Sequence, residues 1–500
     1  MAGIGFKLNR MMQNESISGN ILAFTYSTII SAGPWIITSF TLYLLLSKNF
    51  FLSAFKIIAN ISNFFGISLI KTNAFEKIIN DYFSVALVYS FVFSTLITGG
   101  VLMVISRVIS DNIYLKKYDN IFSDTLNIIF FTNIIASFLA IIFFIFNPNS
   151  PLDFKLSFIY LLVSLCTLWI SAVSAVSTDD YGKYLIGFAI SGFSSLIFAF
   201  IFGYNYGYSG SIFGYGLGIS AGSSYMLYII GNNFGFSFNF DFTWFNGFKK
   251  YWTNLLIGTF YYFALWIDDL MTWYSNYGRG FKNIQGFRLS FIYDSPMFVA
   301  YFSTIPTMAM FVLVLETYFY KKYKTFYNTI IEGGSYTEIE YAKKDMITEM
   351  KSNISMVIKF QLIITVILFL INEILDIMGM VTISSLILRI AVVGAFLNGV
   401  YLMITLLLLY FDFRKEVIYL HFMTFLINLI STPIILNIYG INGMGYGYTI
   451  AFLVGTYLGY NLLLKKLDKI IQIEFNRQKT SMPKGYVVEY EDIKKYVEEK

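Results

Sequence analysis

Ionisable side chains inside long apolar segments are the residues of this sequence best suited to chemistry. Asp268 and Asp269 interrupt one apolar stretch, Glu316 ends the next, and Arg389 lies inside a later one. A charged group within a bilayer is costly, so each is a candidate for a transport pathway. We expect Asp268 or Asp269 to line a water-filled cavity, with Arg389 as a candidate partner. The alternative is that these charges form structural ion pairs.

Aromatic residues surround the acidic pair. Tyr262 and Trp266 precede Asp268 on the same apolar stretch. Tyrosine and tryptophan rings stack on sugar faces, and their polar ends bond hydroxyl groups. We therefore predict that Tyr262, Trp266, Asp268 and Asp269 line one pathway. Aromatic residues make up 20% of the chain, and most of the others must face lipid or form interfacial belts.

Several kinds of chemistry lack the residues they need. The chain has one histidine, His421, and one cysteine, Cys166, which leaves no His/Cys metal cluster to build. A triad mechanism would rest on His421 alone, and no phosphate-binding loop of the Gly-x-x-x-x-Gly-Lys-Ser/Thr type occurs. We expect no cofactor, no metal and no enzymatic activity.

The composition of the chain predicts the kind of fold that positions these residues. The chain is 57% hydrophobic and 13% charged, against about 25% charged in soluble proteins, which predicts an all-α polytopic membrane protein. Twelve spans are expected, and they fall in these stretches: Gly19–Ser47, Tyr82–Ser106, Thr125–Phe146, Leu156–Ser177, two in Tyr184–Phe240, Tyr251–Tyr274, Ser295–Tyr318, Ser352–Asn372, Ile377–Phe411 and two in Val417–Leu464. Phe50–Ile70, between the first two spans, could form an amphipathic surface helix.

Lysine and arginine predict the orientation. With both termini in the cytoplasm, inner segments hold about 25 of these residues and outer loops about 8. The C-terminal tail mixes nine basic with seven acidic residues, which is typical of a solvated helix or a partner surface and not of a nucleic-acid-binding arm.

A repeated hairpin suggests duplication. Tyr206-Gly-Tyr-Ser-Gly210, with Gly214-Tyr-Gly216 after it, reappears 233 residues later as Tyr439-Gly-Ile-Asn-Gly443, with Gly445-Tyr-Gly447 after it. Each copy joins the last two spans of its half, which favours two pseudo-symmetric six-helix lobes around a central cavity. We predict an N-terminal lobe over 1–231, a cytoplasmic linker over 232–250, a C-terminal lobe over 251–464 and a cytoplasmic tail over 465–500. The alternative is that both sites are ordinary glycine-rich turns.

An ordered series of motifs runs through nearly the whole chain. The motifs are Met1-Ala-Gly-Ile-Gly-Phe6, Ser106-Arg-Val-Ile-Ser-Asp111, Trp266-Ile-Asp268, Tyr293-Asp-Ser-Pro-Met-Phe-Val-Ala-Tyr301, Ile305-Pro306, Glu316-Thr317 and Leu409-Tyr-Phe-Asp-Phe-Arg414. Together they resemble the PelG family of Pel exopolysaccharide exporters. Asp269 departs from the pattern, which has lysine there, and Lys48–Asp81 is longer than usual.

This resemblance implies a member of the multidrug/oligosaccharidyl-lipid/polysaccharide exporter superfamily in the bacterial cytoplasmic membrane. It implies export of an amino-sugar polymer made by a cytosolic, PelF-like glycosyltransferase, with other Pel membrane subunits as further partners. The other function left open is an ion-gradient-driven flippase for drugs or lipid-linked oligosaccharides, with Asp268 or Asp269 as the proton or sodium site.

Overall fold

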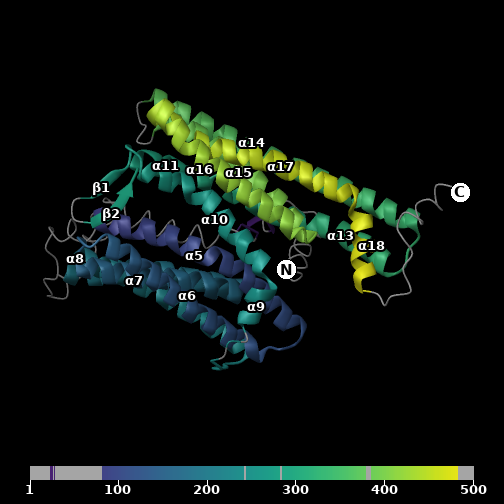
Figure 1. The fold of residues 1–500 in the computed structure, drawn as a ribbon, viewed down its shortest axis with the longest axis horizontal. Coiled ribbons are helices and arrows are strands. Elements are labelled where there is room, and N and C mark those ends of the chain that lie inside the picture. The colour runs from purple at the N-terminus through teal and green to yellow at the C-terminus, as the bar shows by residue number, and fades with distance from the viewer. Residues whose placement is uncertain are drawn as a thin grey trace. The chain divides into compact units, whose positions relative to one another are not determined.

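The computed structural model describes residues 23–25, 27–28, 81–178, 180–240, 242, 244–281, 284–378 and 384–481. Nearly all of this is helical (Figure 1). The described residues include only 23–25 and 27–28 of the predicted first span Gly19–Ser47. They also leave out nearly all of the loop Lys48–Asp81 and residues 482–500.

Helices fill almost every predicted span. They are α5 Asp81–Tyr114, α6 Asp119–Phe146, α7 Leu152–Val176, α8 Tyr181–Phe234, α9 Phe245–Lys250, α10 Trp252–Trp273, α11 Phe291–Phe302, α12 Ile305–Val314, α13 Tyr320–Ile331, α14 Tyr336–Ile377, α15 Ser385–Tyr410, α16 Arg414–Tyr439, α17 Tyr446–Asp468 and α18 Ile470–Ser481. A π-helical turn, Leu315–Phe319, joins α12 to α13. Among the described residues, nine helical segments are long and apolar enough to cross a membrane, and the chain is an all-α polytopic membrane protein.

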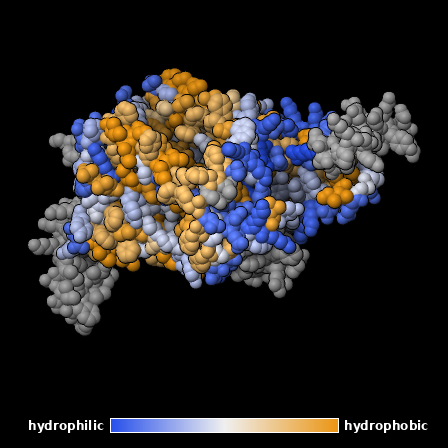
Figure 2. Space-filling model, turned by 60° about the horizontal axis from the view of Figure 1, so that its bottom comes forward, coloured by the Kyte–Doolittle hydropathy of each residue, from blue (hydrophilic) through white to orange (hydrophobic). Residues whose placement is uncertain are grey.

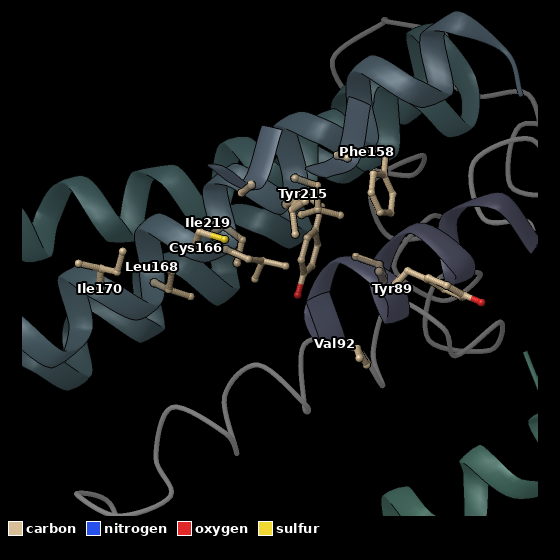
Figure 3. Close-up of a cluster of buried hydrophobic side chains, with 14 of the residues drawn as sticks. Tyr89, Val92, Phe158, Cys166, Leu168, Ile170, Tyr215 and Ile219 are labelled. Atoms are coloured by element: carbon tan, nitrogen blue, oxygen red, sulfur yellow. The ribbon is translucent and has the colours of Figure 1, made fainter. Parts of the chain in front are cut away.

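The chain folds into two compact units, each made of segments that are distant in sequence. One, which we call the α5–α10 unit, comprises Ala32–Ser295 and His421–Gly447. The other comprises Met1–Ser31, Pro296–Leu420 and Tyr448–Lys500. In the α5–α10 unit, α5, α7 and α8 pack around an apolar core that includes Tyr89, Cys166 and Tyr215 (Figure 3).

A short antiparallel β-hairpin follows α10, and the sequence did not predict it. Its strands are β1 Arg279–Phe281 and β2 Ile284–Leu289. The Phe287 ring is buried against aromatic rings of α6 and α7, with centroids 5.0 Å from Phe143 and 5.4 Å from Phe158. The Tyr89 hydroxyl of α5 accepts from the Arg288 amide at 2.9 Å. The hairpin therefore anchors the end of α10 to the helices of the N-terminal half.

The start of α10 is also anchored to α5. Lys250 donates to Asp111 at 2.6 Å, and Tyr251 donates to the same carboxylate at 2.5 Å. The bond to Asp111 raises the pKa of the Lys250 ammonium, because it stabilises the charged form. About one turn after Tyr251, the side-chain amide of Asn254 donates to the Met103 carbonyl at 3.3 Å. Thus α10 follows α5 from one end to the other.

The two glycine-rich turns share a positive φ and close backbone approaches at corresponding positions. Gly207 breaks α8 with φ 69°, and Gly440 begins the turn after α16 with φ 61°, a region that glycine adopts without strain. A Cβ on Gly210 would lie 2.2 Å from the Phe202 carbonyl, and one on Gly443 would lie 2.8 Å from the Ile435 carbonyl. Phe202 and Ile435 are themselves 233 positions apart, so the spacing of the sequence repeat is also that of the contacts.

The contacts correct one detail of the alignment. A Cβ on Gly214 would meet the backbone of Ala199, and a Cβ on Gly447 would meet the backbone of Thr432, again 233 positions on. Gly214 is therefore equivalent to Gly447, and not to Gly445 as the Gly-Tyr-Gly triplets suggest. The superposition of two whole lobes, and their boundaries at 231 and 251, stay predictions.

The surface agrees with a membrane protein. Apolar side chains form broad stretches of the face in Figure 2, and hydrophilic ones gather toward the end that carries α13 and α18. The long helix α14 begins with a capping box between Ser335 and Glu338, typical of a solvated helix start. Farther along, apolar side chains such as Ile363 and Ile367 are about half exposed, as lipid-facing residues are.

Candidate functional site

The predicted acidic pair is buried near the end of α10. Asp268 is 1% exposed and Asp269 is 3% exposed. Adjacent helical residues point about 100° apart, so the two carboxylates face different neighbours. Both lie inside the α5–α10 unit, which fixes what each of them contacts.

Asp268 faces α16 and the start of α11. The Tyr293 hydroxyl donates to its Oδ2, and the Asn428 amide donates to its Oδ1 at 2.9 Å. The same amide donates to the Ala264 carbonyl at 3.0 Å, and the Thr432 hydroxyl donates to the Asn428 Oδ1 at 2.8 Å. Both carboxylate oxygens are thus satisfied by neutral donors, an arrangement that stabilises a buried negative charge without a cation.

A third carboxylate lies close by at the start of α11. Asp294 accepts from the Trp273 indole N–H at 2.8 Å and from the Ser290 amide at 3.2 Å. The bond from Ser290 caps the first turn of α11, where an acidic side chain also complements the helix dipole. Asp294 therefore joins the last residue of α10 to the next helix.

Asp269 differs from both neighbours. Its Oδ2 is buried without a hydrogen-bond partner among the described residues. An ionised carboxylate in that state costs several kcal/mol, so Asp269 needs a proton or a bound cation. No group of described residues has the arrangement of a metal site built from three or more His, Cys, Asp or Glu. A single buried carboxylate oxygen of this kind is suited to holding an exchangeable proton.

The aromatic candidates share a side of α10 with Asp269. Tyr262, Trp266 and Asp269 follow a spacing of four and three residues, which is one helix face. The Tyr262 ring lies over Gly99 of α5, where a Cβ would come within 2.1 Å of the ring. Trp266 is half-buried against the core of the α5–α10 unit. The four α10 candidates thus form two adjacent stripes and not one.

Arg389 belongs to the other unit and has its own partners. Its Nε lies 2.6 Å from Glu373, and its Nη2 lies 3.4 Å from Asp376, both at the end of α14. Its guanidinium also lies 5.8 Å from the centre of the Phe369 ring. Arg389 thus forms the kind of structural ion pair that the sequence left open. Glu316 lies in the π-helical turn, and its side chain is outside the described ones.

Sequence reasoning missed four members of this cluster: Trp273, Tyr293, Asp294 and Asn428. Tyr293 and Asp294 stand in one of the motifs that carried the family resemblance, and this could have indicated them. Asn428 is an amide in a long apolar run, and a polar residue inside a span is a signal in itself.

Comparison with known proteins agrees with this architecture. Residues 1–475 match the family model described as "PelG: Putative exopolysaccharide Exporter (EPS-E)". The chain belongs to the PelG family. A comparison with curated proteins finds no match.

Solved structures similar to this PelG-family chain are transporters. One is an outward-facing multidrug resistance MATE family transporter of the MOP superfamily, with 11% identity, TM-score 0.53 and coverage of 88% of this chain and 95% of that one. The inward-facing conformation of such a transporter gives TM-score 0.51 at 11% identity, with coverage of 78% and 92%. The MATE transporter ClbM in complex with Rb⁺ gives TM-score 0.51 at 12% identity, with coverage of 88% and 94%. At these identities the likeness establishes the fold, and family and fold together make this chain a multi-pass membrane transporter.

Proposed function

We propose that this PelG-family chain exports a nascent amino-sugar exopolysaccharide across the cytoplasmic membrane, in concert with a cytosolic glycosyltransferase. The match of residues 1–475 to the exopolysaccharide exporter family carries the proposal. The glycosyltransferase is PelF-like, other Pel membrane subunits are further partners, and both chain termini are cytoplasmic.

The chemistry of the α10 face that carries Tyr262, Trp266 and Asp269 supports a path for sugars. An acetylated amino-sugar chain is neutral, so it needs stacking faces and hydroxyl-bonding groups more than fixed cations. Tyr262 and Trp266 supply rings with polar ends, and Asp269 lies buried on the same face of α10. A cavity for a lipid pyrophosphate would need several cations, whereas α10 has no lysine or arginine between Trp252 and Trp273.

Membrane vesicles that contain this chain and its glycosyltransferase test the proposal. With a UDP-N-acetylhexosamine outside inverted vesicles, polymer should accumulate inside, protected from an added glycoside hydrolase. Trp266→Ala and Asp268→Asn should reduce protected polymer at unchanged protein abundance, while the matched control Asp376→Asn should not. If vesicles that synthesise polymer protect none of it, the export function is refuted. If both α10 variants protect polymer as the wild type does, the assigned path is wrong.

The second candidate is an ion-gradient-driven flippase for drugs or lipid-linked oligosaccharides. The Oδ2 of Asp269, which has no hydrogen-bond partner among the described residues, favours it, because a buried carboxylate oxygen of this kind suits a coupling proton. Proteoliposomes with a lumenal pH dye report proton movement in response to an imposed substrate gradient. This candidate is favoured if Asp269→Asn abolishes the proton flux while Asp376→Asn leaves it at the wild-type rate. It is excluded if neither substitution changes the flux.

A further inference from the structure

The segment between α8 and α9 is not a simple solvated linker. It carries phenylalanine at every second position, Phe236, Phe238, Phe240 and Phe242. The rings of Phe236 and Phe238 lie 5.3 and 5.4 Å from that of Phe122 in α6. Farther along, Phe240 lies 6.0 Å and Trp244 5.0 Å from Phe131. The segment therefore runs beside α6 for more than two turns.

Polar contacts hold this segment to α6. The Asn127 amide donates to the Asn239 carbonyl at 2.9 Å, and the Ser237 hydroxyl donates to the Asp119 carbonyl. The phenylalanine rings are nonetheless 75% exposed at Phe238, 63% at Phe240 and 65% at Phe242. Since α6 is long and apolar enough to cross the membrane, these exposed rings are suited to contact lipid at the interfacial level, beside the start of α6.

A groove of about 820 Å³ runs between this segment and α6. We call it the α6 groove, and its walls include Phe130, Ile134, Phe138, Phe238 and Phe240.

The polar side chains of the groove are mostly engaged with the protein. Ser123 donates to the Asn120 carbonyl, Asn127 donates to Asn239, and Asn133 donates to the Thr167 hydroxyl at 2.9 Å. The groove therefore presents mainly hydrocarbon to its occupant, which suits an acyl chain better than a polar ligand.

The end of α6 nearest the groove carries positive charge. Lys116 and Lys117 are exposed in the turn before α6, and neither forms an ion pair with a described residue. The turn Lys116–Asp119 has a net charge of +1. Tyr114 is 86% exposed beside it, and the Tyr118 ring stacks on Phe234 at 6.1 Å. Lysines next to exposed tyrosines are typical of the headgroup level of a membrane.

We propose that the α6 groove binds an anionic phospholipid of the cytoplasmic leaflet. One acyl chain lies in the groove, and the phosphate contacts Lys116 and Lys117. This assignment rests on the orientation predicted from lysine and arginine, and it holds whatever the exported substrate is. Charge complementarity selects an anionic over a zwitterionic headgroup, because the zwitterionic one has no net attraction to the turn.

Nanodiscs of equal parts phosphatidylcholine and phosphatidylglycerol test the site with the full chain. Native mass spectrometry after release counts the lipids that the protein retains, and phosphatidylglycerol should predominate. Each lysine near the surface contributes a factor of about 5, so Lys116→Gln with Lys117→Gln should weaken phosphatidylglycerol retention about 30-fold. Lys324→Gln, a matched exposed lysine in the other unit, should leave retention unchanged.

Ser137→Trp fills the groove without changing charge and should displace the retained lipid. Phe146→Ala, an exposed α6 residue outside the groove wall, is its control. Equal retention of phosphatidylcholine and phosphatidylglycerol by the wild type would overturn the proposal. So would full retention by both Ser137→Trp and the double lysine variant. A change from dimer to monomer in Ser137→Trp, with no retained lipid in the wild type, would show that a protein helix occupies the groove instead.

Discussion

The hydrogen bonds of Asn428 give a prediction whose size depends on the charge of Asp268. Asn428→Leu keeps a similar volume but removes both donations, to the Asp268 carboxylate at 2.9 Å and to the Ala264 carbonyl at 3.0 Å, and also removes the acceptor of the Thr432 hydroxyl. Asp268 then keeps the donation from the Tyr293 hydroxyl. In the variant, α10 and α16 still pack together, but the buried Asp268 carboxylate has one hydrogen-bond donor fewer.

The size of the destabilisation follows from the hydrogen bonds that Asn428→Leu removes. A hydrogen bond to a charged group contributes about 1.5–3 kcal/mol, whereas a neutral interhelical bond in a membrane contributes about 0.6 kcal/mol. Asn428→Leu should therefore lower the free energy of unfolding by about 2–4 kcal/mol. Thr432→Val is the matched control, because it removes only the neutral bond to the Asn428 Oδ1, and it should cost about 0.6 kcal/mol.

Reversible unfolding of the full chain in mixed micelles, with rising fractions of denaturing detergent, measures both variants. The reasoning requires Asn428→Leu to be the more destabilised by at least about 1.5 kcal/mol. If the two variants are equally stable, Asp268 is not an ionised carboxylate that Asn428 stabilises. The same measurement on Tyr293→Phe checks the second donor, with an expected loss of about 1.5–3 kcal/mol.

Three further outcomes are expected. Phe287→Ala removes the ring that holds the β-hairpin and should cost about 3–5 kcal/mol in the same unfolding assay; a loss below about 1 kcal/mol would mean that the hairpin does not anchor α10. Gly207→Ala and Gly440→Ala each place a Cβ at positive φ and should each cost at least about 1 kcal/mol, and a neutral effect of either would contradict its role in the turn. Single cysteines placed between Ser335 and Lys351, in a Cys166→Ala background, should react with a membrane-impermeant maleimide only after the cells are opened, and labelling in intact cells would refute the orientation.

Local pattern was enough to predict the helices but not the contacts between them. Long uncharged runs predicted the described spans because a bilayer requires every backbone group to be bonded within its own helix. Gly207 and Gly440 were indicated as turns because glycine adopts positive φ at little cost. The hairpin was missed because β2 is six residues of mixed polarity between two apolar runs, where its burial depends on Phe143 and Phe158 far away in sequence.

The candidate site shows the same limit. Asp268 and Asp269 were selected because charge is costly inside a span; both are buried, and their place in a transport pathway stays a prediction. That they face different neighbours follows from helix geometry, but the identity of those neighbours does not. The partner of Asp268 is 160 residues away, at Asn428, and no local pattern encodes that pairing. Arg389 was considered for that role because it is a charged residue inside a predicted span, and its pairing with Glu373 and Asp376 at the end of α14 is a tertiary contact that the sequence does not show.

The separation of Asp268 from Asn428 along the chain has a consequence for biosynthesis. The α5–α10 unit is completed by His421–Gly447, so it cannot be finished until the end of α16 has been made. At about 5–20 residues per second, a ribosome needs roughly 10–30 s to proceed from Asp268 to Asn428. During that time α10 is inserted with one donor of its carboxylate still missing. A nascent chain stalled before Asn428 should therefore be a good substrate for membrane quality control, and it should become resistant to degradation only once α16 has been delivered.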